Sequence, residues 1–167
     1  MKAQVSFEYY LSLTLFVLFV AYIVFQVVAT VPIYKRQMKS ELLMSEAYQL
    51  SELLVNDEGE PPAWSSVPAA KRIGLANRTN ATNLVSFEKI RALNNSCRTS
   101  EGYTNVSIKL GVDNFYQFNI SILDLNSGQL LVACYPRPMI SRETVKTITR
   151  LAALDVGSYV SITVSMW

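Results

Sequence analysis

The feature that most constrains the fold is an uncharged apolar run from Tyr9 to Val31. It is 23 residues long, and 19 of them are hydrophobic. A helix of about 20 apolar residues spans the ~30 Å hydrocarbon core of a bilayer, so this run is long enough to cross a membrane. It is longer than the ~7–15-residue apolar region of an ordinary signal peptide, and no clean A-x-A site follows it. We therefore expect the run to stay in the mature protein.

Composition excludes several function classes. The chain has no histidine and six isolated glycines, so it holds neither a histidine zinc site nor a Ser-His-Asp triad, and neither a GxGxxG turn nor a P-loop. Its net charge is only +2, from 15 basic and 13 acidic side chains, and the basic residues form no long cluster. We expect no nucleic-acid partner, no metal, no cofactor and no catalytic site.

A short motif precedes and enters the apolar run. Its four positions are Gln4, Ser6, Glu8 and Leu11, in the order Gln-x-Ser-x-Glu-x-x-Leu. This motif resembles the QxSxExxxL pattern of class III signal peptides in archaeal type IV pilin-like proteins. The resemblance implies that a prepilin peptidase cuts between Ala3 and Gln4, that residues 1–3 are a leader, and that Glu8 becomes the fifth mature residue. It also gives these four positions a role in assembly.

The same resemblance implies a function and a set of partners. The chain would be the structural subunit of a cell-surface filament, a helical polymer held together by the apolar helix and serving adhesion or cell–cell contact. The partners would be other copies, the prepilin peptidase, a membrane assembly platform and an ATPase, with the precursor inserted in the membrane. Two alternatives stay open: a monomeric, single-pass anchored extracellular binding protein, and a minor or tip pilin.

The basic residues around the run give a conflicting indication of topology. Lys35, Arg36 and Lys39 follow it, whereas only Lys2 and the amino terminus precede it. The positive-inside rule would place the C-terminal side in the cytoplasm. The glycosylation sequons described below and the pilin resemblance both require an external C-terminal domain, and we expect that orientation.

Helical periodicity continues beyond the run, so we expect one long helix over residues 4–56. Leu43, Ala47, Leu50 and Leu54 fall on one helical face, which predicts an apolar first half and an amphipathic second half. Pro32 removes a backbone donor and clashes with the preceding turn, which predicts a kink. The acidic residues 57–60 lack the spacing of a calcium loop and are interpreted as a solvated, helix-terminating loop.

Residues 57–167 alternate between apolar and polar positions, which predicts a β-rich head. We expect a short helix over 86–93 and strands over 116–122, 144–154 and 159–167. The segment 129–135 is apolar on both faces, which predicts a central strand, and 106–110 fits a strand or a helix. The expected fold class is α+β: a long, kinked N-terminal helix and a small antiparallel sheet.

Five of the ten asparagines open an Asn-x-Ser/Thr sequon, more than chance provides; they are Asn77, Asn80, Asn94, Asn105 and Asn119. They are candidates for N-glycosylation on an outer surface, and an unmodified loop rich in Asn, Ser and Thr is the alternative. Cys97 and Cys134 are either a disulfide, in an oxidising compartment, or two separate buried thiols.

Overall fold

The structure is a computed structural model that describes residues 2–77, 82–113, 115–138 and 145–167, with backbone alone for residues 2–6. The chain divides into two compact units, Met1–Glu41 and Leu42–Trp167. The second unit, here called the head, contains the end of the long helix and the whole sheet. The unit boundary therefore lies inside the helix, whereas the sequence boundary at 56/57 follows the helix end.

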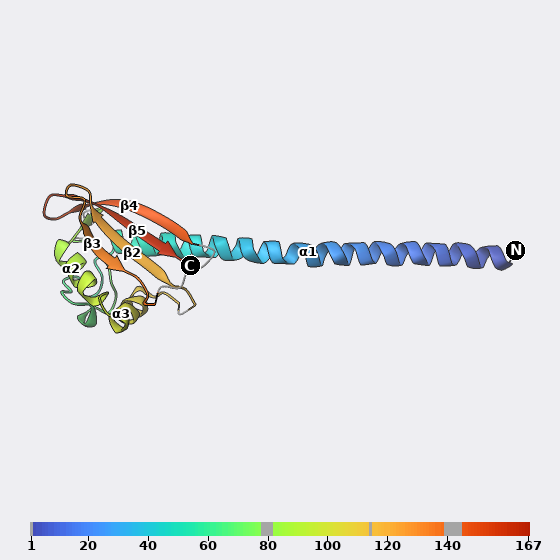
Figure 1. Cartoon of the computed structure of the whole chain (residues 1–167), viewed down its shortest axis with the longest axis horizontal. Helices are drawn as coiled ribbons and strands as arrows, with labels where there is room; N and C mark the ends of the chain where they lie inside the picture. Colours follow the sequence, from blue (N-terminus) through green and yellow to red (C-terminus); the bar gives the residue numbers. More distant parts are fainter. Residues whose placement is uncertain (1, 78–81, 114, 139–144) are drawn as a thin grey trace. The chain divides into compact units, whose positions relative to one another are not determined.

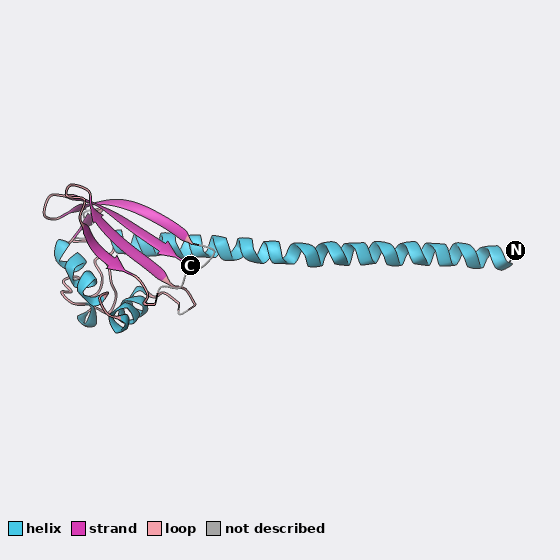
Figure 2. Cartoon of the chain, viewed as in Figure 1, coloured by secondary structure: helices cyan, strands magenta, loops and turns pink. Residues whose placement is uncertain are grey.

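Helix α1 runs from Lys2 to Asn56, close to the predicted range. Pro32 lies inside it, and the residues on both sides of Pro32 stay helical. Figure 2 draws α1 as one uninterrupted helical ribbon, and the kink expected at Pro32 stays a prediction.

The last turns of α1 belong to the head because they bury one face. Leu43, Ala47 and Leu54 are fully buried, and Leu50 is nearly so. This confirms the amphipathic stripe predicted from their spacing. Helix α1 then ends at Asn56, where the Asp57 carboxylate accepts a hydrogen bond from Gly59 N and pairs with Arg72 at 2.9 Å.

The sheet has five strands in the order β1-β4-β5-β2-β3. Their bounds are Leu84–Val85 (β1), Phe118–Asp124 (β2), Leu130–Cys134 (β3), Lys146–Leu154 (β4) and Tyr159–Met166 (β5). The four longer strands pair antiparallel, as expected, and the two-residue β1 pairs parallel to β4. The sheet is therefore mixed, and the α+β fold class is confirmed (Figure 1).

Strand β3 lies at the edge of the sheet, which corrects the expectation that it is central. Its apolar character has another cause. Val132 and Cys134 are buried in the core, and helix α2 packs against the strand. Its core-facing residues are therefore covered like those of a central strand, whereas Leu130 at its start is 54 % exposed.

Two helices complete the head: α2, Phe87–Ser96, and α3, Ser100–Leu110. The ambiguous segment 106–110 is therefore helical, and α3 ends at Gly111, whose φ of 71° is the left-handed conformation of a helix C-cap. A three-residue 3₁₀ helix, Val67–Ala69, precedes them. The core collects the inner faces of the strands, which on β5 are Val160, Ile162, Val164 and Met166, as predicted.

Candidate functional site

The first candidate site is the surface of α1 in the N-terminal unit. Every large hydrophobic side chain from Phe7 to Met38 is between 41 % and 70 % exposed. The helix is long and apolar enough to cross a membrane. Monomeric soluble proteins rarely expose an apolar surface of this size, because burying it elsewhere is favourable by ~25 cal/mol per Å². This surface is therefore compatible with insertion in a membrane.

The motif residues lie at the start of this surface. Ala3, Gln4 and Ser6 are in the first turns of α1, and only their backbone is described. Glu8 is exposed, and Leu11, one turn further on, is 52 % exposed. Leu11 stands three residues after Glu8, one fewer than in the QxSxExxxL pattern, so the match to that pattern is complete only at the first three positions.

Polar side chains inside the apolar run form local hydrogen bonds. The hydroxyls of Thr14 and Thr30 donate to the carbonyl four residues earlier, at 2.8 and 3.0 Å. Gln26 Nε2 donates to the Tyr22 hydroxyl at 2.9 Å. The threonine hydroxyl hydrogen is used in this local bond. The glutamine amide, in contrast, still has a second N–H donor and its oxygen acceptor after one bond is made.

The sequons occupy different environments. Asn105 is exposed on α3, and Asn94 is half-buried on α2. Asn77 is half-buried, and its Nδ2 donates to Asp155 at 3.4 Å. Asn119 is half-buried on β2, on the face of the sheet opposite the core, and Asn80 lies outside the described residues. Among the described sequons, Asn105 is the most accessible to a modifying enzyme.

Along β4 and β5, the residues on the outer face of the sheet are uncharged. At one end, cross-strand partners are polar: Thr147 and Ser165 share a hydrogen bond of 3.0 Å, and Thr149 and Thr163 share one of 3.2 Å. Asn119 pairs with Ser165 in the same row. The polar face predicted for Asn119 is thus part of a wider uncharged surface.

Cys97 and Cys134 form a disulfide that joins the end of α2 to β3. Both residues are buried, with a Cα–Cα distance of 5.0 Å. The sequence separation of 37 residues closes a large loop across the head. The bond therefore restrains the unfolded chain and holds α2 against the edge of the sheet.

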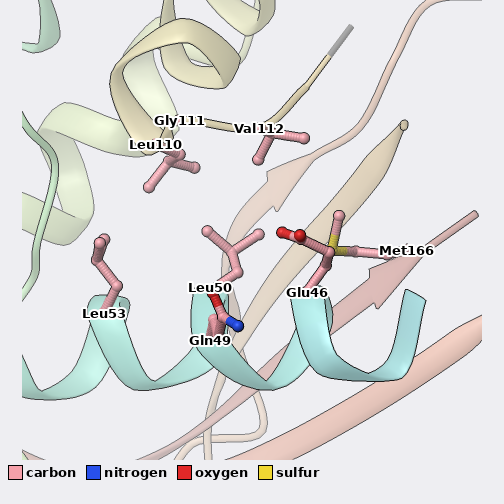
Figure 3. A pocket seen from close by; sticks show the side chains of 8 residues that line it. All are labelled: Glu46, Gln49, Leu50, Leu53, Leu110, Gly111, Val112 and Met166. Atoms are coloured by element: carbon pink, nitrogen blue, oxygen red, sulfur yellow. The ribbon is translucent and has the colours of Figure 1, made fainter. Parts of the chain in front are cut away.

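The head also contains a small cavity of about 120 Å³. Figure 3 shows Leu50 of α1 pointing toward Leu110 and Val112, with Glu46 and Met166 at one side. Pockets that bind small molecules usually have ~300–1,000 Å³. Within the described residues, no three His, Cys, Asp or Glu side chains are grouped to hold a metal. The cavity is therefore a poor candidate for a ligand or catalytic site.

Two lysines cap backbone carbonyls inside the head. Lys89 is 5 % exposed, and its Nζ donates to Glu58 O at 2.8 Å and to Ala76 O at 2.7 Å. Burial lowers the pKa of Lys89 below its ordinary value, an effect partly opposed by Glu58 and Asp57. Lys109 donates to Val67 O and Pro68 O at the 3₁₀ helix. Both ammonium groups stabilise loops of the head by donating to backbone carbonyls.

The local sequence patterns did not identify Arg150, although this residue joins β4 to the last turns of α1 in the head. Its guanidinium pairs with Glu52 at 2.7 Å, donates to Ser51 Oγ at 2.8 Å and lies 4.7 Å from the centre of the Tyr48 ring. The alternation along β4 places Arg150 on the core-facing side of the strand. Because charged side chains are rarely buried without a partner, this position in the sequence could have indicated an ion pair.

Comparison with family models, curated proteins and solved structures finds no match to this chain.

Proposed function

We propose that this chain is a structural subunit of a type IV pilin-like filament. The observation that carries the proposal is the N-terminal unit, a predominantly apolar helix whose large hydrophobic side chains from Phe7 to Met38 are exposed. In a membrane the lipid would cover this surface before assembly, and in a filament the same helices of other copies would cover it. A repeated heterologous contact that does not close generates such a polymer.

Glu8 supports a filament over a simple anchor. A carboxylate at the entry to an apolar helix is costly at membrane depth unless it has a partner. If a peptidase cuts between Ala3 and Gln4, the new terminal amine of a neighbouring copy is that partner. The filament would form at the cell surface with the heads outside and glycans on accessible sequons, Asn105 first. The assembly platform and ATPase are further parts of this proposal.

Two measurements test the proposal. Mass spectrometry of the mature N-terminus is expected to find a chain that starts at Gln4; an intact Met1, or cleavage near Ala29, would contradict it. In the second, Glu8→Ala is expected to abolish sheared surface filaments while membrane insertion continues. Glu41→Ala is the matched control, because Glu41 is an exposed carboxylate of the same helix, and it should assemble normally.

The alternatives predict different results. A monomeric anchored binding protein would tolerate Glu8→Ala without any change in its surface level. A minor or tip pilin would be required for filaments yet present in few copies per filament. Quantifying this chain in sheared filaments separates a major subunit from a minor one.

A further inference from the structure

The polar side chains inside the apolar helix are not distributed evenly around it. An α-helix turns by about 100° per residue, so positions 18 residues apart complete five turns and face the same way. Glu8 and Gln26 are such a pair. Ser12 and Thr30 each follow one of them by four residues, about 40° around the axis, and Tyr22 precedes Gln26 by the same step. We call these five residues the polar seam.

Three polar residues of the described run, Tyr9, Tyr10 and Thr14, lie elsewhere. Thr14 is about 120° from Gln26 around the helix axis. Its hydroxyl is satisfied by Tyr10 O, just as that of Thr30 is satisfied by Gln26 O. The two threonines therefore have the same local hydrogen bond on different faces of one helix, which makes Thr14 a matched reference for the seam.

Gln26 is the centre of the seam because its hydrogen-bonding capacity is only partly used. Its Nε2 donates to the Tyr22 hydroxyl at 2.9 Å, and no described residue donates to its side-chain oxygen Oε1. Since the Tyr22 oxygen accepts this bond, the Tyr22 hydroxyl hydrogen is free to donate. Tyr22 is 59 % exposed, and Gln26 is exposed as well. Lipid tails offer no partner to either group.

A second copy of the same helix is the occupant that fits this face. The amide of glutamine is both donor and acceptor, so it is complementary to the same amide on another copy. Copies inserted in the same orientation hold Gln26 at equal depth, and the identical azimuth brings their Glu8 side chains to the same contact. We propose that the polar seam is the face along which copies of this helix associate in the membrane, through hydrogen bonds of Gln26 and Tyr22. The inference rests on the proposed function, of which it specifies the contact.

The test measures self-association of the full chain in phosphatidylcholine vesicles by energy transfer between donor- and acceptor-labelled copies. The label is attached to a cysteine introduced at Ser65, an exposed head position. Gln26→Leu removes the amide and keeps an apolar, helix-forming side chain. We expect it to weaken association about five- to thirtyfold, the range seen for polar contacts between membrane helices. Thr14→Val is expected to stay within about twofold of the wild type, because its face is not the seam.

A second variant tests whether the amide must lie on the polar seam or whether an amide on any face of the helix is sufficient. Gln26→Leu combined with Val24→Gln moves the amide by two residues, about 160° around the helix and at nearly the same depth. The seam predicts that association stays weak, because Tyr22 and Glu8 do not lie on the new face. Full recovery would overturn the seam, as would equal association of Gln26→Leu and the wild type.

A wild-type chain that inserts but stays monomeric at every protein-to-lipid ratio would also overturn the inference, because the seam would then be covered by a different protein or by water. The filament proposal is judged separately, by the mature N-terminus and by Glu8→Ala. Failure of the seam with filaments intact is therefore distinguishable from failure of the filament itself.

Discussion

Leu18 and Leu54 lie on the same helix, yet their environments are opposite. Leu18 is 61 % exposed in the N-terminal unit, and Leu54 is fully buried in the head. The head covers its apolar residues with its own sheet, whereas the N-terminal unit leaves them to its surroundings. Apolar side chains of the same kind thus stabilise the fold of the head, whereas in the N-terminal unit they are available for membrane insertion or assembly.

The largest effect on the stability of the head, with no effect on the N-terminal unit, is expected from removing the disulfide. Closing a loop of 37 residues stabilises the head by about 4 kcal/mol in the chain-entropy model. Replacing both Cys97 and Cys134 by alanine should lower the free energy of unfolding of the head by this amount. Both tryptophans are buried in the head, so their fluorescence follows this transition in detergent. Membrane retention should be unchanged; its loss would show that the two units are not independent.

The paired leucines provide the next test. Leu54→Ala leaves a cavity in the core and should cost about 3 kcal/mol of head stability. Leu18→Ala should change the same transition by less than about 0.5 kcal/mol, because its side chain is exposed and its loss leaves no cavity in the core of the head. Urea denaturation of the full chain in one detergent measures both variants. Equal effects would contradict the contrast between the two regions.

Arg150 tests how the sheet is joined to the last turns of α1. Arg150→Ala removes the Glu52 ion pair, the Ser51 hydrogen bond and the contact with Tyr48. Because the group is partly exposed, the expected cost is about 1–2 kcal/mol. Arg91→Ala, an exposed arginine on α2, is the control and should be nearly neutral. An unchanged Arg150→Ala variant would mean that apolar packing alone joins these elements.

The smallest effect is a dependence on pH from Lys89. Burial lowers its pKa in the folded head, so the unfolded chain binds more protons between that pKa and the ordinary 10.5. Stability should therefore rise with pH across this window. Denaturation at pH 8 and pH 10 measures the slope, and Lys89→Met should reduce it. A slope that is the same in Lys89→Met would assign it to other groups.

Local patterns predicted much of this head, and long-range contacts account for the failures. The apolar spacing of Leu43 and Leu54 and the alternation along β5 identified buried faces, because each depends only on the period of one element. The order of the strands depends on pairing between distant segments, so the period of one element does not predict it. Strand β3 was expected in the centre and lies at the edge, and the two-residue β1 has too few positions to show any period.

The start of α2 illustrates the same limit at one residue. Ser86 stands at the N-cap, where its hydroxyl would ordinarily accept from the helix, but it makes no such bond. Asp155, from the turn between β4 and β5, accepts from Phe87 N at 3.1 Å instead. A cap supplied from 68 residues away leaves no local signal.

The sequence by itself determined that one helix is apolar over a membrane's thickness, with Glu8 at its start and Gln26 five turns on. These properties depend only on composition and on the helical period. Tertiary structure alone decided that Leu54 is buried in the head, whereas Leu18 on the same helix is exposed. It also decided that Arg150 joins the sheet to the helix. The exposed fraction of a side chain depends on which other segments pack against it, and contacts between distant segments are not visible in a local sequence pattern.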